Sequence, residues 1–107
     1  MNMILFNETV SIDNTVAAEW LQWMQETHIP AVMATTYFLN FQIAKVMEEE
    51  ETGGSTYAIQ YYARHMDDLL EYHREHDQDM QARMQAKYPG QYVAFRTVLE
   101  VVENPNK

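Results

Sequence analysis

Stretches with strand periodicity and stretches with helical periodicity follow one another along this chain in the order β-α-β-β-α-β. Alternating residues typical of strands cover residues 3–12, 38–50, 56–63 and 91–102. Large apolar side chains at helical spacing occupy residues 16–28 and 66–88. This order predicts an α+β fold in which both helices cover one face of a four-stranded antiparallel sheet, with the first and third strands in its centre.

Turn signals set the boundaries of these elements. Pro30 disfavours helical geometry at Ile29, so we expect the first helix to end near His28 and a short second piece to cover residues 31–35. An acidic run at residues 48–51, followed by Gly53 and Gly54, predicts the tip of a hairpin. We expect a single domain over residues 1–103 and a polar tail at residues 104–107.

Composition limits the classes of partner. The net charge is −9 and the seven Lys and Arg residues are scattered, which argues against binding to nucleic acid or to an anionic membrane surface. The chain has no cysteine, no signal-peptide pattern and no apolar stretch of membrane-spanning length, so a cytoplasmic location is the default expectation. No phosphate-binding glycine loop or redox motif is present, and we predict no cofactor.

The last strand is apolar on both of its faces, although a sheet face in contact with water is usually more polar. By simple alternation we assign to the face away from the helices the residues Leu5, Phe38, Ala44, Val46, Ala94, Val98 and Val102. A second copy of the chain, related by a twofold axis, is the simplest cover for such a patch, and we therefore predict a homodimer.

Polar residues interrupt this open face, and alternation assigns to it Asn7, Asn40, Gln42, Gln60, Arg96 and Glu100. Amides beside one fixed cation suit a carboxylate or an enolate oxygen, which makes Arg96 a candidate catalytic residue and Asn7, Gln60 and Asn40 candidate ligand-binding residues. The alternative is a structural network in which Arg96 pairs with Glu100 or Glu8. Glu8 itself interrupts an apolar strand face and marks either a bulge or a functional position.

The first helix offers two further candidates. His28 suits a general base at the mouth of a pocket, because imidazole titrates near neutral pH; its other interpretation is a residue that caps the helix end. Trp23 and the methionines at helical spacing either line a pocket for an aromatic ligand or simply form the core.

His73 and His76 lie three residues apart on the second helix and suit zinc or nickel only weakly. Leu70 and Met80 occupy the positions one turn before and one turn after them, so a third ligand at helical spacing is missing. We therefore predict no metal site.

Three stretches carry a resemblance to known proteins: residues 20–24 running into His28-Ile29-Pro30, then Gln60-Tyr61, and then residues 94–97. With the element order, they resemble the dimeric α+β barrel superfamily of ferredoxin-like proteins, and more closely a small bacterial family of this kind with no established reaction. The likeness extends distantly to the antibiotic-biosynthesis-type monooxygenases. It implies two ferredoxin-like sheets packed face to face.

Two functions are compatible with these features, and the sequence leaves open whether the protein is an enzyme. The first is a homodimeric domain that binds a small molecule between its sheet and its helices. The alternative is a cofactor-independent oxygenase or isomerase acting on an activated aromatic or enolisable substrate, with His28 as the base and Arg96, Asn7 and Gln60 stabilising the anion. That mechanism requires His28 and Arg96 to face the same cavity.

Overall fold

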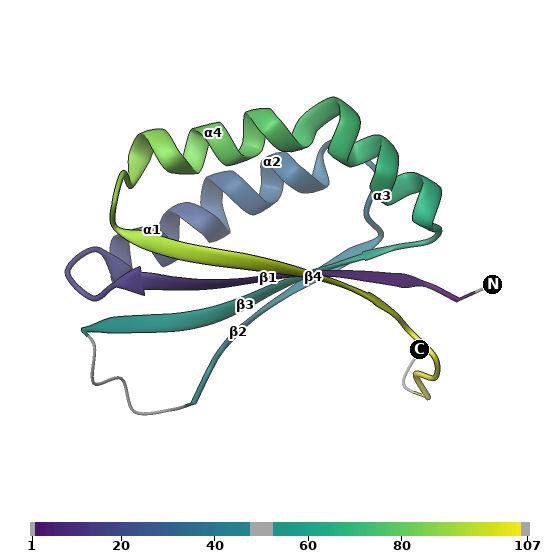
Figure 1. The fold of residues 1–107 in the computed structure, drawn as a ribbon, viewed down its shortest axis with the longest axis horizontal. Coiled ribbons are helices and arrows are strands. Elements are labelled where there is room, and N and C mark those ends of the chain that lie inside the picture. Colours follow the sequence, from purple (N-terminus) through teal and green to yellow (C-terminus); the bar gives the residue numbers. More distant parts are fainter. Residues whose placement is uncertain (1, 48–52, 106–107) are drawn as a thin grey trace.

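The computed structural model describes residues 2–47 and 53–105, and it shows a helix layer packed on one face of a single sheet (Figure 1). The predicted hairpin tip at residues 48–51 and the last two residues of the predicted tail lie outside the described residues. The strands are β1 (Ile4–Asp13), β2 (Asn40–Lys45), β3 (Gly54–Ala63) and β4 (Tyr92–Glu100). The helical elements are α1 (Ala17–Trp23), η1 (Met24–His28), α2 (Ile29–Met33), α3 (Met66–Tyr72), η2 (His73–Asp77) and α4 (Gln78–Lys87).

The sheet has the strand order β2-β3-β1-β4, with antiparallel neighbours throughout. The prediction that the first and third strands lie in the centre is thus confirmed. β1 pairs Asn7 with Gln60 of β3 and pairs Glu8 with Arg96 of β4. Pairing continues without interruption past Glu8, so this residue marks no bulge.

The helix layer consists of two continuous helical rods, each with one π-helical turn in its middle. α1, η1 and α2 form the first rod, and α3, η2 and α4 form the second, as predicted for residues 66–88. The expected end of the first helix near His28 is wrong, because His28 and Ile29 both keep right-handed helical backbone angles. The amide of Ile29 instead donates to the carbonyl of Met24, five residues earlier, and this wider turn accommodates Pro30, which has no amide hydrogen of its own.

The core fills the space between the two layers. Its largest fully buried side chains include Trp20, Tyr61, Phe6 and Met24. Trp20 and Met24 are therefore core residues, which for the methionine is the simpler of its two interpretations. Trp23 is only partly buried and packs edge-on against Tyr88.

The predicted faces of β4 are reversed in the structure. Residues opposite each other in a ladder share a face, and Arg96 lies opposite Glu8, Val98 opposite Phe6, and Ala94 opposite Val10. Since Phe6 and Val10 belong to the core, β4 presents Ala94, Arg96, Val98 and Glu100 to the helix side. Its open face consists of Val93, Phe95, Thr97 and Leu99.

The other members of the predicted apolar patch divide between the two sides of the sheet. Leu5 and Ala44 lie on the open face, because they pair with Tyr62 and Ala58 of β3, whereas Phe38 precedes β2 and is buried in the core. Val46 and Val102 lie beyond the ends of their strands, because β2 and β4 are shorter than predicted.

Candidate functional site

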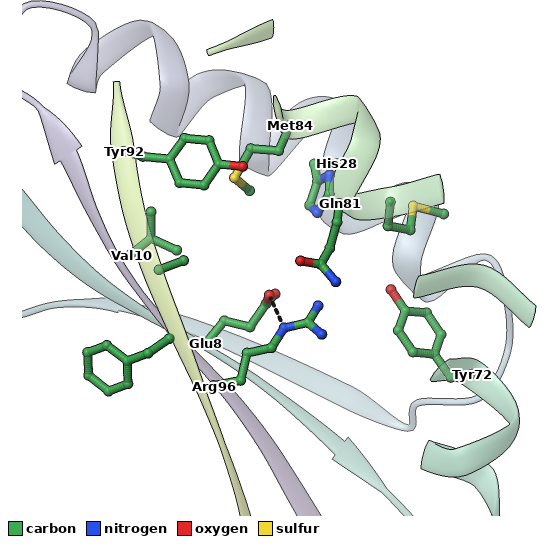
Figure 2. Close-up of a pocket in the computed structure, with 11 residues that line it drawn as sticks. Glu8, Val10, His28, Tyr72, Gln81, Met84, Tyr92 and Arg96 are labelled. Atoms are coloured by element: carbon green, nitrogen blue, oxygen red, sulfur yellow. Dashed lines mark hydrogen bonds and ion pairs between the residues drawn. The ribbon is translucent and has the colours of Figure 1, made fainter. Parts of the chain in front are cut away.

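A cavity of about 130 Å³ opens between the helix layer and the sheet, on the side of the edge strand β4 (Figure 2). This volume is well above the roughly 10–15 Å³ that a cavity needs to hold a single water molecule. The wall combines charged, polar and apolar side chains: Glu8, Val10, His28, Tyr72, Met80, Gln81, Met84, Tyr92, Ala94, Phe95 and Arg96. The cavity is the principal candidate for a binding site, because well-packed interiors keep few voids of this size.

His28 and Asp77 enter this region from the two π-helical turns, each as the last residue of its turn. Both are buried, and apart from tyrosine and tryptophan they are the only polar or charged residues that are buried within the part of the chain that the structure describes. A π-helical turn widens the rod locally and changes the direction of the side chains that follow, and such turns occur frequently at functional sites.

Three charged groups form a network across the inner end of the cavity. The Nε of Arg96 donates to Oε2 of Glu8 at 3.0 Å, while its Nη1 and Nη2 donate to the two carboxylate oxygens of Asp77 at 2.9 and 2.5 Å. Gln81 donates to Oδ2 of the same aspartate at 2.8 Å. The network ties strands β1 and β4 to the second helical rod, and it pairs Arg96 with Glu8, one of the two partners expected from the sequence.

The two carboxylates respond differently to this environment. Burial raises the pKa of Glu8 above its usual value, and the attraction of Arg96 only partly offsets this effect. Burial also raises the pKa of Asp77, but hydrogen bonds from Arg96 and Gln81 together with the charge of Arg96 outweigh it, so the pKa is lowered overall. Arg96 therefore compensates Asp77 more fully than Glu8.

His28 lies on the wall opposite this network and remains neutral at physiological pH. Burial, with a smaller contribution from the charge of Arg83, lowers the pKa of His28 to about 4. The imidazole packs against Trp23 with ring centres 5.0 Å apart. Its Nδ1 is buried and makes no hydrogen bond among the described residues, so a polar atom beside the cavity is left without a partner.

An apolar and aromatic surface completes the cavity. Tyr72 and Tyr92 lie on either side of it in Figure 2, and Met80 and Met84 contribute from α4. Methionine adapts its shape to irregular ligands, and aromatic rings offer flat contact area. The combination suits a small molecule with an apolar body and one polar end.

The residues predicted from the sequence divide between the two faces of the sheet. His28 and Arg96 line the same cavity, as the proposed enzyme mechanism requires. The predicted position of Arg96 on the open face, beside Asn7 and Gln60, is wrong, and Glu100 likewise lies on the helix side. Trp23 lies next to the cavity through its contact with His28.

Asn7 and Gln60 do lie together, as predicted, but on the opposite face of the sheet. Amide side chains form a ladder there: Gln42 donates to Gln60 at 3.1 Å, Gln60 to Asn7 at 3.2 Å, and Asn7 to Thr9 at 3.1 Å. Asn40 lies further along β2, beside a shallower hollow of about 220 Å³. These amides cannot contact a ligand held by His28 and Arg96, because the sheet separates them.

His73 and His76, which lie three residues apart on the second rod, do not line the cavity. His73 packs edge-on against Phe6, and His76 lies near Tyr37 and Tyr72. No group of three potential ligands with metal-binding geometry occurs among residues 2–47 and 53–105. These contacts fit the interpretation of both histidines as partly buried helix-face residues.

Sequence reasoning missed Asp77, Gln81 and Tyr72 as site residues. Their positions depend on the long-range packing of the second rod over β4, and periodicity alone carries no sign of it. Glu8 did give a signal, because a carboxylate interrupted an otherwise apolar strand face.

The element order and the antiparallel four-stranded sheet define a ferredoxin-like α+β fold. The chain belongs to the family described as a domain of unknown function, DUF4286, whose profile matches residues 3–102. No curated protein matches the sequence. None of the helices in the described part of the chain is long and apolar enough to cross a membrane.

Solved structures share the fold at low sequence identity. A dimeric ferredoxin-like protein from an uncultured marine organism is 10% identical over 97% of this chain and 99% of its own, with a TM-score of 0.69. A candidate antibiotic biosynthesis monooxygenase from Caulobacter crescentus is 21% identical over 95% and 92% of the two chains, with a TM-score of 0.64. SnoaB, a cofactor-independent oxygenase from Streptomyces nogalater, is 10% identical over 100% of both chains, with a TM-score of 0.69.

Proposed function

We propose that this protein is a cytoplasmic homodimer that binds a small molecule in the cavity between its helices and its sheet. The observation that carries the proposal is that one cavity is lined both by His28, with its unpartnered Nδ1, and by Glu8 and Arg96 of the charged network. Polar groups that converge on an otherwise apolar pocket are typical of ligand sites.

The open face of the sheet supports the homodimer. Val93, Phe95 and Leu99 lie there with 71%, 64% and 43% of their surface exposed. Exposed apolar residues gathered on one strand mark an interaction surface, and a relative with this fold is named as dimeric. A second copy would cover these residues and enclose the amide ladder between the two sheets.

Filling the cavity should abolish ligand binding. Ala94 lies on the cavity wall, and we expect Ala94→Leu to place its larger side chain in the space that a ligand would occupy. A panel of single-ring aromatic alcohols, amines and acids should include compounds that raise the melting temperature of the wild-type protein. At a concentration about ten times Kd, a ligand stabilises the folded state by about 1.4 kcal/mol.

The matched control is Ala86→Leu, which makes the same change on the exposed surface of α4. We expect this variant to respond to the same compounds as the wild type, whereas Ala94→Leu should not. Equal responses of all three proteins, or no response from any, would argue against the cavity as a binding site.

The second candidate function is a cofactor-independent isomerase or oxygenase acting on an enolisable or activated aromatic substrate. It is favoured because His28 and Arg96 line one cavity and because SnoaB, with this fold, is named as a cofactor-independent oxygenase. A proton would pass from the substrate to the neutral imidazole, and the resulting enolate would lie beside Arg96. A pKa of about 4 makes His28 a weak base, and two carboxylates already offset Arg96, so we place this function second.

Proton exchange distinguishes the two functions. If the protein is such an enzyme, it should accelerate deuterium incorporation into 2-tetralone in D₂O by about a hundredfold or more, and His28→Gln should remove the acceleration. Nuclear magnetic resonance measures the loss of the benzylic proton signal. If the wild type and His28→Gln exchange the proton at the same rate, the enzymatic function is wrong and ligand binding remains.

A further inference from the structure

We propose that the cavity selects ligands that carry a protonated amine, and that it discriminates against carboxylates. This inference rests on the proposed function and names the ligand class for the same site. It reverses the role that the sequence suggested for Arg96, which was to attract an anion.

The first argument for a cationic ligand is the arrangement of charged side chains at the cavity. Arg96 contacts two carboxylates, Glu8 at 3.0 Å and Asp77 at 2.5 Å, and all three side chains are largely buried. One guanidinium faces two carboxylates, so its charge is already offset and is not free to hold an anion. Arg83, which also acts on His28, is exposed and pairs with Asp79 at 2.8 Å. A carboxylate ligand would therefore find no unpaired cation in the network, whereas a cationic ligand would be attracted to the carboxylates of Glu8 and Asp77.

The second argument for a cationic ligand is the set of hydrogen-bond acceptors at the cavity. Arg96 already donates to both carboxylates, and Gln81 donates through its nitrogen to Asp77. Among the described residues, Oε1 of Glu8 and Oε1 of Gln81 have no hydrogen-bond donor. Figure 2 shows both side chains directed into the cavity. Both oxygens can accept hydrogen bonds from a ligand, and an ammonium group has three donors.

The remaining wall fits the body of such a ligand. Tyr72 and Tyr92 supply aromatic surface, which attracts cations as well as flat apolar groups. His28 lines the cavity as a neutral imidazole, so it does not repel a cationic ligand. The net charge of −9 favours the approach of cations over long distances.

Three compounds with the same ring and different head groups test the selectivity. Isothermal titration calorimetry at pH 7 should give benzylamine a Kd at least about tenfold lower than that of benzyl alcohol, which corresponds to about 1.4 kcal/mol, and benzoate should bind more weakly still. Glu8→Gln should bring benzylamine within about threefold of benzyl alcohol. Glu100→Gln is the matched control. It also removes one carboxylate, but Glu100 lies on β4 and outside the cavity, so the preference for the amine should not change.

The possible outcomes distinguish a failure of the amine preference from a failure of the proposed function. If benzoate or benzyl alcohol binds as tightly as benzylamine, and Ala94→Leu abolishes that binding, the amine preference is wrong while the cavity stays a ligand site. If none of the three compounds binds the wild type, the proposed function fails and the inference fails with it. If Glu8→Gln does not fold, as judged by circular dichroism, the ranking of the three compounds on the wild type decides the inference.

Discussion

Replacing Arg96 by Met should destabilise the folded protein by about 3 kcal/mol. The substitution keeps much of the apolar stem and removes the guanidinium, which lies over the ring of Phe6 at 5.1 Å and carries the charge that Glu8 and Asp77 share. Two largely buried carboxylates would then face each other without a cation, and breaking a buried ion pair in this way costs about 3–5 kcal/mol. We take the lower end because Arg96 is 27% exposed. Urea unfolding at one fixed protein concentration measures the loss.

Arg83→Met is the matched control, because Arg83 makes one ion pair with Asp79 and both side chains are more than half exposed. Exposed pairs of this kind contribute about 0.2–1 kcal/mol. If Arg96→Met costs no more than Arg83→Met, the charged network does not hold the second rod to the sheet. Adding Glu8→Gln to Arg96→Met should recover part of the lost stability, because it removes one of the two unpaired charges.

Phe95→Glu should convert the proposed dimer to a folded monomer. Phe95 lies on the open face of β4 with 64% of its surface exposed in the single chain, and a twofold axis would bury it twice. Placing two carboxylates in this interface should weaken association by at least about a hundredfold, or about 2.7 kcal/mol. Sedimentation at micromolar concentration should show a mass near 12.6 kDa for the variant and twice that mass for the wild type.

Leu70→Glu provides the control on the opposite side of the molecule, since Leu70 is 55% exposed on α3. We expect it to remain a dimer. If the wild type sediments as a monomer, or if Phe95→Glu sediments as a dimer, the open face of the sheet is not the interface.

Element order and topology could be predicted from the sequence, because they depend on local periodicity and on the few ways in which these elements pack. The same reasoning placed Asn7 beside Gln60, and they are 3.2 Å apart through Oδ1 and Nε2. Pairs in the two central strands are predictable because β1 carries a clear core face with Phe6, Val10 and Ile12.

The two faces of β4 were assigned the wrong way round for a physical reason. Both faces of this strand are apolar, so alternation shows which residues share a face but not which face meets the helices. The pairing of Glu8 with Arg96 settles the choice, and it depends on register across 88 residues of sequence. The predicted anion site failed with that assignment, because Arg96 lies on the other side of the sheet from Asn7 and Gln60.

The π-helical turns escaped prediction because apolar residues at helical spacing do not distinguish such a turn from the α-helix around it. Pro30 normally interrupts a helix, yet η1 carries the first rod through it and places His28 beside the cavity. Asp77 lies at the end of η2 in the same way. The sequence shows these residues only as members of helical stretches.

The most direct test of the cavity as a ligand site is a titration with benzylamine, benzyl alcohol and benzoate, followed through carbon-13-labelled methionine methyl groups. Met80 and Met84 line the cavity, whereas Met47 is 90% exposed and Met3 lies beside the hollow near Asn40. We predict that whichever compounds bind shift the signals of Met80 and Met84 in proportion to the bound fraction and leave those of Met3 and Met47 in place. Shifts at Met3 with none at Met80 and Met84, or no shifts at any methionine, would contradict the proposal that this cavity is the functional site.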